Sequence, residues 1–364
     1  MGKRWACGIV GVGMWALSGC AEASSAADTA GSDVIDTDAS DTDTGSDEDT
    51  GREGDVAPDA DTGPDGDDAG DTAVVLGDPD VLVGSFQVTL VPPVAATAEA
   101  EATPGFTSVY GKVYDGPTPS SVQWEEVDRD GDCVLWVPRV PSCTTRCGSS
   151  ALCVDDEVCQ SYPTAHPVGE VTFSGITTAS GDDETVMKPV ANAYQPSETL
   201  PFPAFTEGAR VFINSGGGDY AKFTIEARGI VPLVLTSGEM VLDGESLALT
   251  WTAGTEPSAA ITVKLDISHH GGTRGVLTCA TADDGALDIA ARLVAELLDL
   301  GVSGLPTIVV TRSATGVAVI EPGRVELVLA SIVEEPVTVP GLVSCTDDSQ
   351  CPEGTTCQDD LACR

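Results

Sequence analysis

The sequence predicts an all-β protein built as an antiparallel β-sandwich, either one large sandwich or two that abut. Apolar residues alternate with polar ones over many short segments, the pattern of strands with one buried face. The chain contains 40 Gly and 23 Pro but only 5% aromatic residues, so turns are frequent. Strands and helices do not alternate along the chain, which disfavours a Rossmann or TIM-barrel enzyme.

The predicted strands lie within a β body over residues 81–340. The first alternation, at Phe86, Val88 and Leu90, is typical of the rest. The glycine-rich break 215–219 separates two of the strands. About ten short strands are expected in total. The others include 171–173, 211–213, 223–227, 247–251, 261–267, 307–310 and 325–329.

One short helix is predicted between Asp283-Asp284-Gly285 and Gly301. Its apolar face would consist of Ile289, Leu293, Val294, Leu297 and Leu298 at helical spacing. We expect this helix to pack on one end of a sheet, rather than to bind a partner.

The charge of the chain bounds its partners. Among 364 residues, 58 acids and 17 bases give a net charge of −41. A nucleic-acid interface needs clustered Lys and Arg, so no nucleic-acid partner is expected. Electrostatic docking on an anionic membrane is disfavoured for the same reason.

The N-terminal residues have the pattern of an export signal. Lys3 and Arg4 precede an apolar stretch over 6–16, which is shorter than the roughly 20 residues of a membrane-spanning helix. Leu17-Ser18-Gly19-Cys20 then resembles the lipobox of bacterial lipoproteins. The resemblance implies a signal peptide over 1–19 and lipidation of Cys20. The alternative is an ordinary secretory signal cut near 21–23.

Residues 20–80 are predicted to be an acidic disordered linker. From Glu22 to Asp80 there are 20 acids and one base, Arg52. Such a segment buries too little apolar surface to offset its ordering entropy. Repeated Asp-x-Asp steps could instead bind calcium, but the linker lacks the glycine and terminal acid of a calcium loop.

Ten cysteines follow the linker and form two clusters. Cys133, Cys143, Cys147, Cys153 and Cys159 make the first, within a Cys-rich insert over 133–162. Cys345, Cys351, Cys357 and Cys363 make the second, within a C-terminal module over 341–364, and Cys279 stands alone. An even number suits disulfides in an oxidising compartment. Zinc is the alternative, but zinc sites usually use CxxC pairs or nearby His, and no CxxC is present.

The spacing Cys147-x5-Cys153-x5-Cys159 recurs in the C-terminal module as a weak internal repeat. The pairing cannot be read from sequence, because four cysteines allow three connectivities. If the clusters otherwise close internally, one of the first five is left for Cys279. The tail resembles short cysteine-rich modules of exported Gram-negative lipoproteins, as does the order of lipobox, Asp/Thr linker and β body. This resemblance implies location and architecture, not activity.

The segment 126–132 is the best metal candidate. With Glu126 first, Asp128, Asp130 and Gly131 take the third, fifth and sixth places of a calcium loop, and Asp132 follows. The twelfth place is Val137 rather than an acid, so an acidic turn is the simpler interpretation.

Other candidate sites are weaker. His269 and His270 could supply imidazole ligands, although adjacent strand residues face opposite ways and an exposed turn is the simpler interpretation. The Gly-x-Ser-x-Gly and His-Glu-x-x-His patterns of hydrolases are absent, as are the Walker and dinucleotide glycine patterns.

These features predict a non-enzymatic surface lipoprotein without a resident cofactor, in which a tethered β-sandwich serves binding, adhesion or envelope structure. Its partners would be the membrane, through the lipid, and an extracellular protein or glycan. Residue 21 is Ala rather than Asp, which by resemblance implies the outer membrane, with the body either exposed on the surface or facing the periplasm. The alternative is an exported hydrolase or carbohydrate-binding accessory protein using paired acids such as Glu125 and Glu126.

Overall fold

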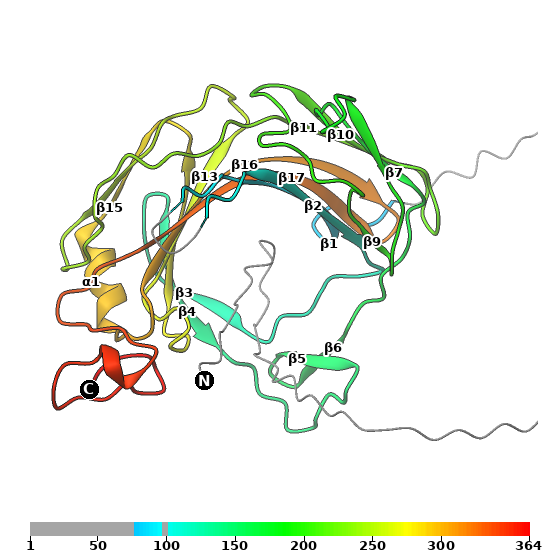
Figure 1. Ribbon diagram of the computed structural model, residues 1–364. Coiled ribbons are helices and arrows are strands. Elements are labelled where there is room, and N and C mark those ends of the chain that lie inside the picture. Colours follow the sequence, from blue (N-terminus) through cyan, green and yellow to red (C-terminus); the bar gives the residue numbers. More distant parts are fainter. Residues whose placement is uncertain (1–75, 97–100) are drawn as a thin grey trace, which may run out of the picture. The chain divides into compact units, whose positions relative to one another are not determined.

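The computed structural model describes residues 76–96 and 101–364. These residues form seventeen β-strands, one α-helix and one 3-10 helix (Figure 1). The predicted all-β class is therefore confirmed. The predicted signal peptide, Cys20 and most of the linker lie outside the described residues. No helix within the described part of the chain is long and apolar enough to cross a membrane.

The largest element is a nine-stranded sheet that curves across Figure 1. In spatial order its strands are β3 (Gln123–Asp130), β4 (Cys133–Arg139), β14 (Val276–Ala282), β13 (Ala260–Asp266), β16 (Thr307–Ile320), β17 (Gly323–Pro336), β1 (Leu82–Val91), β2 (Phe106–Val113) and β9 (Ala193–Tyr194). β16 and β17 have 14 residues each and form one long hairpin, whereas the sequence predicted only short strands.

One pair in this sheet departs from the predicted antiparallel arrangement. β1 and β17 run parallel, with Phe86 opposite Leu327 and Leu90 opposite Ser331. The other neighbouring strands of the sheet are antiparallel. Alternation in a sequence fixes which face of a strand is buried but not the direction of its neighbour. For that reason the parallel pair had no signal in the sequence.

Three smaller sheets accompany the large one. The four-stranded sheet consists, in order, of β11 (Thr224–Arg228), β10 (Arg210–Ser215), β7 (Val171–Ser174) and β8 (Glu184–Met187). β12 (Leu247–Thr250) pairs with β15 (Ala286–Ile289), and β5 (Ala151–Asp155) pairs with β6 (Val158–Ser161). The helices are α1 (Ala291–Asp299) and the 3-10 turn η1 (Asp348–Gln350).

Two hydrophobic cores share the nine-stranded sheet. The first core joins Phe86 and Leu327 of the large sheet to Phe173 and Ile213 of the four-stranded sheet. The second core joins the β13, β14 and β16 region to the β12–β15 pair and α1. Its members include Ile261, Val263, Leu277, Val310, Leu249, Ile289, Leu293 and Leu297. The body is thus two abutting sandwich-like halves with one sheet in common.

Polar residues mark the boundary between the two cores. On β16, Val310 belongs to the second core and Ala314 to the first, and the fully buried Arg312 lies between them. Ser331 lies opposite Arg312 on β17 and is also buried. Its hydroxyl accepts a 2.9 Å bond from the Leu233 backbone N–H. Buried polar groups with partners therefore lie at this boundary in place of apolar packing.

The helix begins later than the sequence predicted. Residues 286–289 form β15, so Ile289 belongs to a strand and not to the helix face. Residues 286–289 pair instead with β12, and this pairing satisfies their backbone hydrogen-bonding groups in place of a helical turn. Within α1, Leu293, Val294 and Leu297 are buried as predicted.

Candidate functional site

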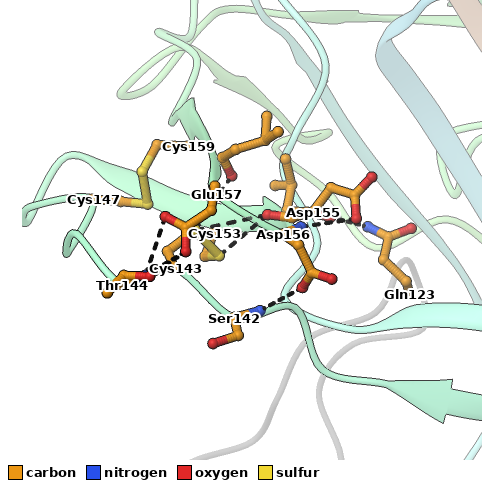
Figure 2. The surroundings of a disulfide bond; sticks show 12 residues. Gln123, Ser142, Cys143, Thr144, Cys147, Cys153, Asp155, Asp156, Glu157 and Cys159 are labelled. Carbon is orange, nitrogen blue, oxygen red and sulfur yellow. Dashed lines mark hydrogen bonds between the residues drawn. A yellow bond between two sulfur atoms is a disulfide. The ribbon is translucent and has the colours of Figure 1, made fainter.

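The most distinctive feature on the β body is the disulfide insert, which we define as residues 140–162, between β4 and β7. It contains the hairpin β5–β6, in which Cys153 lies opposite Cys159. The disulfides Cys143–Cys153 and Cys147–Cys159 tie this hairpin to the segment that enters it. Figure 2 shows both bridges beside the acidic turn of the hairpin. So short a segment cannot build its own core, so the bridges hold its shape.

Arg139, at the end of β4, connects the insert to the β3–β4 hairpin. Its Nε lies 2.8 Å from Glu125 Oε1, and its Nη2 lies 2.7 Å from Asp155 Oδ1. Its Nη1 lies 3.3 Å from Asp156 Oδ2. The hydrogen bond from Arg139 lowers the pKa of the Asp155 carboxyl. One guanidinium therefore neutralises acids from two elements, although solvent screens these exposed pairs and each is weak.

The turn of the β5–β6 hairpin is hydrogen-bonded to the backbone of the insert itself. Glu157 has a left-handed φ of 61°, and its carboxylate accepts bonds from the hydroxyl and the backbone N–H of Thr144. The Thr144 hydroxyl, and then its N–H, lower the pKa of Glu157. The Ser142 N–H donates to Asp156 Oδ1 over 3.0 Å (Figure 2). The carboxylates of Glu157 and Asp156 are therefore engaged in contacts that stabilise the insert itself, rather than being free to bind a ligand.

All ten cysteines after the linker are paired. The C-terminal module contains Cys345–Cys357 and Cys351–Cys363. The fifth bridge, Cys133–Cys279, joins directly opposed residues of β4 and β14. It corresponds to the pairing expected from counting, in which one cysteine of the first cluster is left for Cys279.

The ten cysteines that the structure describes do not form a zinc site in this arrangement. Two groups of sulfurs approach one another closely, at Cys143, Cys147 and Cys153 and at Cys345, Cys351 and Cys363. Each sulfur belongs to a disulfide, whereas a zinc ligand must be a thiolate.

The acids of the calcium candidate are directed to arginines rather than to one point. Glu126 forms a bidentate pair with Arg129, and the hydrogen bond from Arg129 lowers the Glu126 pKa. Asp128 and Asp130 both pair with Arg292, which extends from α1. Asp132 lies in the turn between β3 and β4, where its backbone carbonyl accepts a bond from Ala280. A β-hairpin with a bulge at 126–128 replaces the compact loop that calcium needs.

His269 and His270 lie in a turn after β13, as expected, but their rings do not face opposite ways. His270 has a left-handed φ of 61°, and the two ring centroids are 3.9 Å apart. Burial, followed by the neighbouring His270, lowers the pKa of His269. Glu334 of β17 lies 3.8 Å from His269 Nε2. Because the pair lies in a turn and not on a strand, strand alternation does not separate the two rings.

A third histidine forms a cluster that sequence reasoning missed. His166 Nδ1 lies 2.7 Å from Asp219 Oδ2, and its Nε2 lies 3.5 Å from Asp115 Oδ2. The bond with Asp219 raises the pKa of His166 most, and Asp115 adds to the rise despite partial burial. The three residues are far apart in sequence: Asp115 follows β2, His166 precedes β7 and Asp219 follows β10. The sequence offered no spacing that would have united them.

The acids of the hydrolase alternative are already engaged. Glu125 is paired with Arg139, and Glu126 with Arg129. Both are on β3, and their side chains are 56% and 42% exposed. An open hollow on the insert, lined by Arg146, Leu152 and the Cys143–Cys153 bridge, includes neither acid.

Comparison with known protein families and with curated proteins found no match. No family model matches the chain, and no curated protein matches it significantly.

Proposed function

We propose that this chain is an exported, lipid-anchored protein of the outer membrane whose β body is displayed for binding rather than catalysis. The observation that carries the proposal is the pairing of all ten cysteines after the linker in five disulfides. Such bridges persist in oxidising compartments outside the cytosol. The lipobox-like sequence before Cys20 agrees with the same destination.

The acidic linker supports the display role. Twenty acids and one base over Glu22–Asp80 favour an extended chain between the anchor and β1. The body then carries its own stabilisation, because one bridge joins strands of the large sheet and four others hold two small modules. We propose an extracellular protein or glycan as the ligand class.

Intact-mass analysis of protein extracted from membranes, with and without reduction, tests the proposal. We expect a chain that begins at an acylated Cys20. Reduction should add two hydrogens for each of the five disulfides. An unacylated chain would refute the anchor, and thiols free before reduction would refute the oxidising compartment.

Arrays of glycans and matrix proteins test the binding role. Saturable binding to one class would support the proposal and identify the ligand. No binding by a protein that passes the mass test would favour a purely structural envelope role. Turnover of a glycan by the purified chain would overturn the non-enzymatic assignment.

A further inference from the structure

The two cysteine-rich segments share their disulfide pattern. In the insert module (residues 142–159), the first cysteine pairs with the third and the second with the fourth. The C-terminal module (residues 344–363) has the same interlocked pattern. In both, the third and fourth cysteines also face each other as an antiparallel pair, at Cys153–Cys159 and at Cys357–Cys363.

Local sequence and backbone agree with the shared pattern. Both modules begin Ser-Cys-Thr and end Cys-x-Asp-Asp-x-x-Cys. Two residues before the last cysteine, Glu157 and Leu361 have left-handed φ angles of 61° and 56°. A left-handed backbone is uncommon for residues other than glycine. Its recurrence at one position indicates that the modules are two copies of one unit, differing by two residues between their first two cysteines.

The C-terminal copy is docked on the β body. The Gly304 N–H donates to the Asp360 carbonyl over 2.7 Å, and the Ser344 hydroxyl donates to the Gly304 carbonyl over 2.6 Å. A Cβ at Gly271 would lie 2.5 Å from the Asp360 carbonyl oxygen, so the contact requires glycine there. We call the two turns that contain Gly271 and Gly304 the docking turns. Ala362, two residues after Asp360, is only 2% exposed.

The matching face of the insert copy is open. Val158 stands where the C-terminal copy has Ala362, and it is 49% exposed. Ser142 and Asp156 stand where Ser344 and Asp360 dock, and both are exposed. Val140 and Tyr162, at the base of the insert, are 72% and 51% exposed. Aromatic side chains are enriched at protein interfaces, and this short segment exposes one together with two valines.

We propose that the open face of the insert module is a docking surface for a protein that presents a glycine turn with a free backbone N–H group. The docked C-terminal copy shows what covers this face, namely one glycine N–H, that of Gly304, which donates to the carbonyl of the residue before the left-handed one. The partner is another protein, because the C-terminal module already occupies the docking turns of this chain. This inference deepens the proposed function by naming a binding face and a partner chemistry.

The docking turns of this chain can stand in for the partner protein, once the C-terminal module has been displaced from them. Ala362→Lys places a charge at a buried position two residues from Asp360 and should undock the C-terminal module, which faster hydrogen exchange of the Gly304 amide will report. Ser344→Lys is a second route to the same state. Val158→Ala then gives the insert the side chain of the docked copy. All variants carry Cys20→Ser, so failure of the anchor proposal does not affect the result.

Sedimentation of the full-length chain at about 1 M salt, where charges are screened within about 3 Å, measures the outcome. We expect the undocked Val158→Ala chain to self-associate with concentration. Val158→Lys in the same background should be monomeric, whereas Val186→Lys, at a similarly exposed valine of β8, should leave association intact. The proposal would be overturned if every variant stayed monomeric. It would also be overturned if the Val158→Lys chain associated as strongly as the Val158→Ala chain.

Discussion

Arg312 and Asp283 form a bidentate ion pair in the interior, where neither side chain is more than 3% exposed. Arg312 Nε and Nη2 lie 2.7 and 2.9 Å from the two carboxylate oxygens. The remaining Arg312 donors bond the carbonyls of Val231, Pro232 and Thr252. Every polar group of the pair therefore has a partner, and the pair joins β16 to the residue that follows β14 and to the segment at Val231 and Pro232.

Removal of one member of this pair should be strongly destabilising. Arg312→Ala leaves a carboxylate and three carbonyls without their partner in the interior, so we expect a loss of about 3–5 kcal/mol in the free energy of unfolding. Urea denaturation measures it. Arg210→Ala is the control, because the Arg210–Glu226 pair is exposed and should lose only about 0–1 kcal/mol. Equal losses would contradict this account.

The same pair should make stability depend on acid. Burial raises the pKa of Asp283, but bonds from Arg312 and Trp251 outweigh it and the pKa is lowered. The stabilisation is then present above the ordinary carboxyl pKa of about 3.9 and is lost as pH falls through the lower folded value. Urea unfolding of wild type and Asp283→Asn at several pH values should show their difference shrinking in acid. A constant difference would exclude the linkage.

His166 should have the opposite pH dependence. Its pKa is raised, first by the hydrogen bond with Asp219. The contribution of the cluster is therefore complete below the ordinary histidine pKa of about 6.5 and is lost as pH rises through the higher folded value. NMR titration of the ring should give a pKa above the ordinary one. Asp219→Asn should return it toward the ordinary value, and an unchanged pKa in that variant would refute the assignment.

Gly111 should not tolerate a side chain. It lies opposite Phe86 across β1 and β2, and a Cβ there would be 2.2 Å from the Phe86 ring. Gly111→Ala must displace a fully buried ring, so we expect a loss of about 1–3 kcal/mol. Gly238 has open space and no left-handed φ, so Gly238→Ala should be nearly neutral. Thermal unfolding of both variants provides the comparison.

The Cys133–Cys279 bridge should matter more than a local one. It closes a loop with a sequence separation of 146, against 10 for Cys143–Cys153. Chain entropy then predicts losses of about 5 and about 3 kcal/mol when each pair is replaced by alanine. Denaturation curves of the two double variants test this order, and a reversed order would show that the unfolded chain is not the main source of stabilisation.

Local patterns predicted the strands well, because alternation at positions such as Phe86 to Leu90 is set by burial of one face. Long-range relations were not predictable in the same way. Arg312 alternates in phase with apolar residues of β16, yet nothing nearby in sequence indicated Asp283 as its partner. The Asp115–His166–Asp219 cluster and the parallel β1–β17 pair likewise depend on topology. In the calcium candidate, two of the acids pair with Arg292, which is distant in sequence and which local patterns did not indicate.

The position of β1 also determines how the body would respond to mechanical load. Force applied through the segment before Leu82 enters a strand held along its length by β17 on one side and β2 on the other. A pull along the strand axis loads these hydrogen bonds together in shear, instead of opening them one after another as at a sheet edge. The chain thus enters the body at a point where the sheet resists extension.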